Sequence, residues 1–452
     1  MKIPFLTQKR SSILILLLVA TGWGCTPSQN DPVSSTDIAL NEALVKTGGS
    51  LVFFRFPAAS DLQKIPQDPK NPLTAEKVEL GRHLYHETAL AINPKVKKSL
   101  MTYSCASCHH VDAGFQACLP QGIGEGGLGY GSIGEGRQSD PVYRESELDV
   151  QPLRSPSTLN IAYQPNVLWN GQFGATGVNK GTQNNWTKDT PKEANFLGFE
   201  GVETQAIAGL TVHRMGSNED LFRNSTYRKL FQNAFPNVPE VDRYSIKNIG
   251  LAIASYERTL LATEAPFQRW LRGEKGALSD DQKKGALLFF GKGNCVQCHT
   301  GPALNSMAFY AMGMSDLSGS RVHNVNPNQS DHKGRGSFTG KAEDMYKFKV
   351  PQLYNLRDSP FFGHGSNFRT VREVIMYKNR AVAQNSVVPS GQLAKEFSPL
   401  HLSPEEISQL TDFIENSLRD PKLTRYVPTL TPSGYCIPNN DIQTRVDRSW
   451  FR

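Results

Sequence analysis

The stretches Cys105-Ala106-Ser107-Cys108-His109 and Cys295-Val296-Gln297-Cys298-His299 decide how this chain is interpreted. A c-type haem needs two thiols three residues apart for its vinyl groups and a histidine directly after them as an iron ligand. Both stretches meet that requirement, and the 7 Cys and 10 His present would by chance give roughly 0.002 such pentapeptides. A zinc site or a thioredoxin-like redox pair is the alternative, but zinc favours paired cysteine clusters and a redox pair does not need the histidine. The sequence therefore predicts two covalently attached haem c groups.

The N-terminus has the layout of a secretory signal. Three cations within residues 2–10 precede an apolar run at 13–20 that is too short to span a membrane. We therefore expect residues 1–25 to be a signal peptide and the protein to lie in the periplasm or cell envelope, where bacteria attach c-type haems. Gly24-Cys25 resembles a bacterial lipoprotein cleavage site. A lipid anchor on Cys25 and a plain cleaved signal are both open.

The composition is that of a globular protein with two or three domains, since 38% of residues are hydrophobic and 20% are charged. The formal net charge of +7 falls to about +4 once the signal is removed, which argues against a nucleic-acid partner. Four of the seven cysteines lie in the two motifs and Cys25 lies in the signal region. Cys118 and Cys436 remain, and they either form a disulfide or are two unrelated buried thiols.

Hydrophobic periodicity predicts a mainly α fold, with two cytochrome-c-like haem domains packed together and little β structure. Residues 26–70 are polar and read as a tether or extension, whereas residues 113–140 are rich in Gly and read as a loop. Thr74 is an N-cap for a helix before the first motif. The other helical patterns lie at 203–215, 219–234, 245–263, 280–290, 370–379 and 403–418.

A helix followed by a haem motif occurs twice, which indicates a domain boundary near residue 275. We expect an N-terminal haem domain at 71–275 and a C-terminal haem domain at 276–452. The tail of the second domain could pack back on the first.

Several separated stretches along the chain carry a resemblance to a known family. They are Leu80-Gly81-Arg82-His83-Leu84-Tyr85, Ser104 to His109, Arg154-Ser155-Pro156-Ser157-Thr158-Leu159-Asn160, Leu168-Trp169-Asn170-Gly171-Gln172, Glu203-Thr204-Gln205-Ala206, Gly293 to Gly301 and Phe348-Lys349-Val350-Pro351-Gln352-Leu353-Tyr354-Asn355-Leu356. In this order they resemble the bacterial di-haem cytochrome c peroxidase and MauG superfamily over most of residues 70–420. The resemblance implies that the N-terminal haem reacts with peroxide and that the C-terminal haem takes in electrons and passes them on.

The first haem site departs from the peroxidase branch of that family. In that branch a histidine on the following loop caps the iron until activation, but residues 111–147 contain no histidine, so we expect an open iron on His109. The glutamate that the family places after its Gln, here Gln205, is also missing. We expect His213 to move the proton in peroxide cleavage and Arg214 to stabilise the departing oxygen, with Gln205 shaping the pocket. The alternative is a His-Arg pair that merely ends a helix.

The resemblance also addresses the region between the haems. Trp169 falls where the family has a bridging aromatic residue, although plain core packing is the alternative. The family binds Ca²⁺ there through an asparagine, and Arg154 stands at that position. A guanidinium repels the cation, so the sequence argues against Ca²⁺ and we expect Arg154 to fill the site, paired with Asp358.

The sixth ligand of the second haem stays open. The family takes a Met or Tyr from a helix that corresponds to residues 370–378 here, and two ways of aligning it point to Tyr377 or Lys378. Lys378 extends the apolar face of the helix but must be neutral to bind iron, which burial would enforce. Tyr377 would stabilise ferric iron, and Met376 would favour electron relay. All three are alternatives opposite His299.

These residues favour a peroxidase that reduces H₂O₂ at the N-terminal haem with electrons relayed by the C-terminal haem. The electron donor would be a small protein, either a cytochrome or a cupredoxin. One alternative is a MauG-like oxidase that modifies a partner protein through a ferryl intermediate, and another is a non-catalytic di-haem electron-transfer cytochrome. Relatives of the peroxidase branch often dimerise, so a homodimer is a further expectation of the resemblance.

Overall fold

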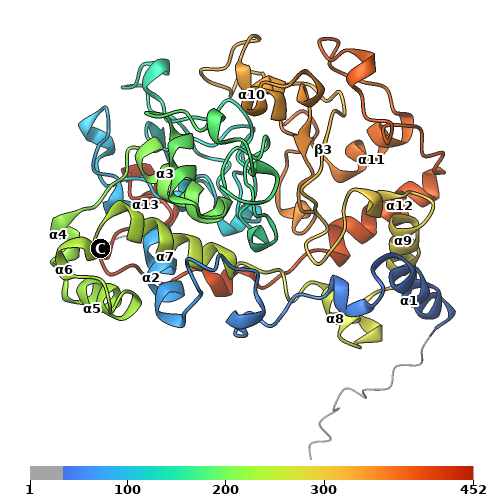
Figure 1. The fold of residues 1–452 in the computed structure, drawn as a ribbon, viewed down its shortest axis with the longest axis horizontal. Coiled ribbons are helices and arrows are strands. Elements are labelled where there is room, and N and C mark those ends of the chain that lie inside the picture. The colour runs from blue at the N-terminus through green and yellow to red at the C-terminus, as the bar shows by residue number, and fades with distance from the viewer. Residues whose placement is uncertain (1–33, 451–452) are drawn as a thin grey trace, which may run out of the picture.

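The structure is a computed structural model that describes residues 34–450. Figure 1 shows two groups of helices at opposite ends of the molecule with long loops between them. We call the group that runs from α2 (Ala75–His86) to α7 (Ile246–Arg258) the first lobe. The group that contains α1 (Ser35–Gly48), α9 (Asp280–Phe290), α11 (Val371–Arg380) and α12 (Pro404–Asp412) is the second lobe. The predicted mainly α fold with little β structure is confirmed. The expected signal peptide and Cys25 lie outside the described residues.

The α-helices are connected by long loops and short 3₁₀ turns. They are α1 (Ser35–Gly48), α2 (Ala75–His86), α3 (Gly201–Val212), α4 (Glu219–Phe222), α5 (Ser225–Ala234), α6 (Glu240–Arg243), α7 (Ile246–Arg258), α8 (Pro266–Leu271), α9 (Asp280–Phe290), α10 (Arg335–Thr339), α11 (Val371–Arg380), α12 (Pro404–Asp412) and α13 (Ile442–Asp447). A π-helical turn at Phe413–Ser417 continues α12.

Two short antiparallel strand pairs are the only sheets in the described part of the chain. They are β1 (Gly127–Leu128) with β2 (Gln138–Ser139), and β3 (Phe309–Tyr310) with β4 (Phe348–Lys349). The first pair interrupts the Gly-rich segment that the sequence predicts as a loop. Within residues 34–450, no helix combines the length and the apolar character needed to cross a bilayer.

The predicted N-cap of α2 is present, since the Thr74 side chain accepts a hydrogen bond from the Lys77 N–H.

A glycine allows the central helices of each lobe to cross closely. In the first lobe a Cβ on Gly81 of α2 would lie 1.9 Å from the Ala252 carbonyl oxygen of α7. In the second lobe a Cβ on Gly285 of α9 would lie 2.1 Å from the Gln409 carbonyl oxygen of α12. Since no side chain fits at either crossing, only glycine permits this packing.

Part of the segment before α2, which was expected to be a tether or an extension, forms a helix. Residues 35–48 form α1, which packs against α9 in the second lobe. Its buried face contains Leu40 and Leu44 and also Asp37, whose carboxylate accepts hydrogen bonds from Trp270 Nε1 at 2.7 Å and Lys283 Nζ at 2.9 Å. The sequence did not predict this helix because the buried polar residue Asp37 interrupts the hydrophobic periodicity of its inner face.

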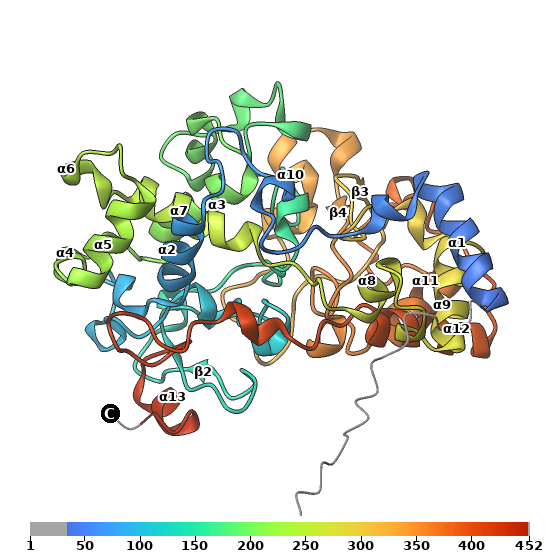
Figure 2. The same cartoon turned by 90° about the horizontal axis from the view of Figure 1, so that it is seen from below.

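The chain end returns to the first lobe, where Figure 2 shows α13 beside the loop that carries β2. Ser104, next to the first motif, donates a hydrogen bond to the Pro438 carbonyl at 2.9 Å, and Gly129 N–H donates to Asp441 at 2.9 Å. Cys118 and Cys436 are separate buried thiols in the structure, so the disulfide alternative is not realised.

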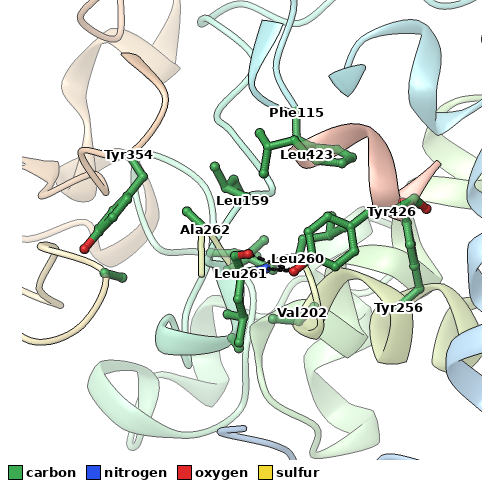
Figure 3. Close-up of a cluster of buried hydrophobic side chains, with 14 of the residues drawn as sticks. Phe115, Leu159, Val202, Tyr256, Leu260, Leu261, Ala262, Tyr354, Leu423 and Tyr426 are labelled. Atoms are coloured by element: carbon green, nitrogen blue, oxygen red, sulfur yellow. Dashed lines mark hydrogen bonds between the residues drawn. The ribbon is translucent and has the colours of Figure 1, made fainter. Parts of the chain in front are cut away.

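A continuous hydrophobic core joins the two lobes. Figure 3 shows Phe115 and Leu159 close to Leu261 and to Leu423, which comes from the C-terminal part of the chain. The Tyr426 hydroxyl donates to the Leu261 carbonyl at 2.7 Å. The lobes are therefore fixed relative to one another by this core.

Candidate functional site

Both Cys-X-X-Cys-His motifs adopt the same local turn. Each begins with a 3₁₀ turn, at Cys105–Ser107 and at Cys295–Gln297. In each, the N–H groups of the second cysteine and of the histidine donate to the carbonyl of the first cysteine, at 3.3 and 3.1 Å in the first motif and 3.2 and 2.9 Å in the second. This turn holds the two thiols and the imidazole within one short segment.

Each motif lines a cavity. The larger cavity, about 540 Å³, is bordered by Cys295, Cys298 and His299 and lies within the usual size range of cofactor sites, about 300–1,000 Å³. The smaller cavity, about 220 Å³, is bordered by the first motif. Six residues line both cavities and so form the wall between them: Arg154, Pro156, Ser157, Gln164, Leu168 and Trp169.

The donor groups fit a c-type haem at both motifs. Burial lowers the pKa of His109 and of His299 to about 4, so both imidazoles are neutral, as an iron ligand must be. His299 Nδ1 lies 3.1 Å from the carbonyl oxygens of Leu304 and Pro351, which leaves Nε2 for the metal. The four motif cysteines are free thiols rather than disulfides, and so can form thioether bonds.

His213 is the candidate acid–base group at the smaller cavity. It directly follows α3, lines the cavity, and its Nδ1 lies 2.9 Å from Oδ2 of Asp149. Burial lowers the pKa of His213, but the charge of Asp149 and its hydrogen bond outweigh burial and raise it overall. Asp149 was not singled out from the sequence, and it gives the imidazole a fixed orientation with Nε2 free.

Arg214 is not brought to the cavity with His213. Its backbone has a left-handed φ of 55°, and its guanidinium forms an ion pair with the buried Glu125 carboxylate and donates to the Glu147 carbonyl at 2.9 Å. Arg214 is not among the residues that line either cavity. The expectation that it stabilises the departing oxygen is therefore not met in this structure.

Gln205 and Trp169 both lie at the cavities. Gln205, on α3, lines the smaller cavity. Trp169 belongs to the shared wall, and its indole N–H donates to the Arg154 carbonyl at 2.8 Å. The indole ring also meets the ring of His364 edge-on, with a centroid distance of 6.3 Å. Trp169 thus contacts residues of the larger cavity while bordering the smaller one.

Arg154 is buried, but it does not pair with Asp358. Its guanidinium donates to the oxygens of Gln116, Ala117, Leu119 and Ser359 at 2.7–3.0 Å. Asp358 instead accepts from Arg419 Nε at 2.7 Å. The predicted ion pair is therefore wrong, because carbonyl and side-chain oxygens surround the guanidinium and Asp358 has its own cation.

The three candidate sixth ligands on α11 have different surroundings. Lys378 lines the larger cavity together with the apolar face of its helix, and burial lowers the pKa of its amine. The Tyr377 hydroxyl donates to the Met312 carbonyl at 2.6 Å. Met376 packs against the hydrophobic core. Neither Tyr377 nor Met376 is among the residues that line the cavity, so only Lys378 is in position to reach it.

Comparison with known proteins gives one family match and several relatives. Residues 75–276 match the family model described as di-haem cytochrome c peroxidase. The chain is 26% identical to the cytochrome-c peroxidase IdrP1 of Pseudomonas sp. (strain SCT), over 84% of this chain and 90% of that protein. It is also 26% identical to the methylamine utilization protein MauG of Methylorubrum extorquens, over 79% of this chain and 83% of that protein.

Solved structures share the fold. A MauG-like protein associated with microbial copper homeostasis is 22% identical, with a TM-score of 0.55 over 80% of this chain and 96% of that one. The diheme peroxidase BthA from Burkholderia thailandensis E264 is 17% identical, with a TM-score of 0.51 over 80% of this chain and 90% of that one. At these identities the likeness concerns the fold.

Proposed function

We propose a function on the premise that this chain belongs to the di-haem cytochrome c peroxidase and MauG family. The protein is an exported di-haem peroxidase that reduces H₂O₂ at the first motif with electrons relayed through the second. The observation that carries the proposal is the inequality of the two cavities. His213, held by Asp149, borders the first cavity. The second is bordered by a comparable pair, His364 with Asp316, but also by the amine of Lys378, whereas among the described residues no lysine borders the first.

The cofactors are two haem c groups. Cys105 and Cys108 would hold the first, with His109 as the iron ligand, and Cys295 and Cys298 would hold the second, with His299. When bound, each haem supplies an iron that changes oxidation state. The donor set at each motif, with neutral imidazoles and free thiols, supports this assignment.

His213 would be the acid–base group that transfers the proton in peroxide cleavage. With Nδ1 held by Asp149, Nε2 can take the proton from the inner oxygen of H₂O₂ and return it to the outer oxygen, which then leaves as water. Gln205 would help to shape this cavity. No histidine lies in residues 111–147, and this favours a first iron that peroxide can reach without a ligand leaving.

Lys378 would be the sixth ligand of the second haem. Tyr377 is a weaker candidate because it does not line the cavity and its hydroxyl donates to the Met312 carbonyl at 2.6 Å. Lys378, in contrast, lines the cavity, and its amine makes only a longer hydrogen bond, 3.3 Å, to the Glu396 carbonyl. The neutral amine needed for ligation is supported by the burial that lowers the pKa of Lys378. His299 and Lys378 would together hold the second haem, which would supply electron transfer, whereas peroxide would react at the first site, where His213 can move its proton.

Trp169 would carry charge between the two sites. Its indole ring borders both cavities and is fixed by the hydrogen bond to the Arg154 carbonyl. An oxidisable aromatic ring in a shared wall shortens each electron-transfer step. The wall contains Arg154 where a family member would place a calcium ligand, and this argues against Ca²⁺ here.

The protein would act in the periplasm or cell envelope, after removal of the signal peptide that lies within residues 1–25. Cleavage before Cys25 would leave that cysteine at the new N-terminus. In a more specific form of this proposal, a lipid on Cys25 anchors the protein to a membrane. The electron donor would be a small cytochrome or cupredoxin, and the active unit could be a homodimer.

The second candidate is a MauG-like oxidase that uses the same site on a partner protein. Two observations favour it: one relative is a MauG protein, and the histidine-free loop 111–147 favours an open first iron. Such an enzyme would need H₂O₂ and a protein substrate but no external electron donor.

Steady-state turnover of the purified holoprotein tests the proposal. With H₂O₂ and a reduced small c-type cytochrome, we expect two equivalents of donor to be oxidised for each H₂O₂ consumed. The C105A/C108A variant should lose this activity, and the C295A/C298A variant should still consume peroxide in a single turnover but not oxidise the donor continuously. A holoprotein with both haems that oxidises no donor, chemical or protein, would contradict the peroxidase proposal.

A further inference from the structure

Lys349 is a buried cation without a counter-charge. It lies on β4, is 6% exposed and lines the larger cavity, where its Nζ donates to the Gln164 side-chain oxygen. Burial lowers the pKa of its amine to about 7. Among the described residues, no carboxylate lies within ion-pair distance of it. An ammonium in such a place is costly unless a negative group pairs with it.

His332 adds a second unsatisfied group to the same cavity. It is 7% exposed, and neither of its ring nitrogens has a hydrogen-bond partner among the described residues. Its Nδ1 lies 3.8 Å from Oδ2 of Asp316. That carboxylate already accepts from Asn385 at 2.8 Å and lies 3.2 Å from the His364 ring nitrogen. His332 therefore has hydrogen-bonding capacity left over.

Lys349 and His332 come from neighbouring segments. The chain after His332 runs beside the segment that leads into β4, because the Arg335 N–H donates to the Lys347 carbonyl at 2.7 Å and the Tyr346 N–H donates to the Lys333 carbonyl at 2.8 Å. Both side chains border the cavity that also contains the second motif. The amine without a counter-charge and the imidazole without a hydrogen-bond partner thus border one cavity from neighbouring segments.

We propose that Lys349, together with His332, binds the carboxylate groups of the haem attached at the second motif. A haem c has two propionate carboxylates in addition to its iron, and these supply the negative charge that the described residues around Lys349 do not. The ammonium would form a charge-assisted hydrogen bond to one carboxylate, and the imidazole would donate to the same group or to the other. This inference rests on the proposed haem at Cys295, Cys298 and His299.

The pairing makes Lys349 a positioning residue for the second haem. A positive charge near a haem disfavours the oxidised iron, so it raises the reduction potential. Lys349 also joins the cavity to the shared wall, since its backbone N–H donates to the Trp169 carbonyl at 2.8 Å. Its charge therefore lies where electrons would pass between the two sites.

The test uses holoproteins that carry both haems. The Lys349→Met variant is compared with Lys349→Arg, which keeps the charge, and with Lys341→Met, which makes the same change at an exposed lysine of the same segment. The reduction potential of the second haem is measured by spectroelectrochemistry, and its propionate bending band is measured by resonance Raman spectroscopy. Neither readout depends on peroxidase turnover, so the proposal about Lys349 can fail or succeed separately from the proposed activity.

We expect Lys349→Met to lower the potential and to shift the propionate band, whereas Lys349→Arg and Lys341→Met stay close to wild type. An unchanged potential and band in Lys349→Met would overturn the proposal, because an inorganic anion or water would then be the partner of Lys349. If Lys349→Met does not retain the second haem, the arginine variant decides: retention with a near-wild-type potential supports the proposal, and loss overturns it.

Discussion

His213 Nδ1 lies 2.9 Å from Oδ2 of Asp149, a carboxylate whose side chain is 4% exposed. A buried carboxylate that accepts from one imidazole nitrogen fixes both the orientation and the tautomer of the ring. The other nitrogen is then free at the smaller cavity. In the proposed function, this pair would take the role of the glutamate that the resemblance led us to seek after Gln205.

Replacement of His213 by alanine should slow the reaction with peroxide by about 10² or more, because the proton can no longer move between the two oxygens. Stopped-flow measurement of the second-order rate of the ferric holoprotein with H₂O₂ gives the result. The Arg214→Gln variant is the control, and we expect it to stay within about threefold of wild type because Arg214 does not border the cavity. Equal rates for wild type and His213→Ala would refute the acid–base role.

The Asp149→Asn variant should move the pH dependence of the same rate. Neutral His213 is the form that accepts a proton, so the rate falls as pH decreases through its pKa. Asp149 raises that pKa, and its removal should shift the acidic limb of the profile to lower pH while decreasing the maximal rate. If the acidic limb of the pH–rate profile stays at the same pH in Asp149→Asn, a group other than His213 is responsible for it.

Lys378→Met should change the optical spectrum of the second haem, since a thioether would replace the amine or leave the position open. Tyr377→Phe removes only the hydroxyl that donates to Met312 and should leave the haem spectrum as in wild type. Near-infrared charge-transfer bands of the ferric protein distinguish the axial ligands. If Tyr377→Phe changes those bands and Lys378→Met does not, the ligand assignment is reversed.

The contribution of Asp37, which anchors helix α1, to the stability of the protein should depend on pH. Burial would raise the pKa of Asp37, but hydrogen bonds from Trp270, Ser34 and Lys283 lower it well below its ordinary value of 3.8. A carboxylate with a lowered folded-state pKa stabilises the protein above its unfolded-state pKa, and this stabilisation is lost as pH falls below about 4. Wild type should therefore exceed Asp37→Asn in thermal stability at pH 7, and the difference should narrow at pH 3. A constant difference between the two pH values would contradict this.

Local patterns were enough to predict most of the helices. The apolar spacing of α7, α9 and α12 and the Thr74 cap are properties of neighbouring residues, and the structure has them where they were expected. Periodicity also placed Lys378 on the apolar face of α11. It could not exclude Tyr377, because the Met312 carbonyl that engages that hydroxyl lies 65 residues earlier in the chain.

The parts of the site that sequence reasoning missed depend on distant contacts. Asp149 is 64 residues from His213, and Gln164 is 185 residues from Lys349. No spacing rule connects such pairs. The same holds for Arg154, whose partners come from two loops that are far apart in the sequence, one at residues 116–119 and one at Ser359. Its supposed pairing with Asp358 could therefore not be judged before the fold was known.

Electron paramagnetic resonance of the ferric holoprotein, before and after one equivalent of H₂O₂, tests most directly whether the two haems are unequal. We predict one high-spin signal, from an open iron on His109, and one low-spin signal, from a six-coordinate iron on His299. Peroxide should remove the high-spin signal first. Two low-spin signals that peroxide leaves unchanged would contradict the account, because neither iron would then be open to the substrate.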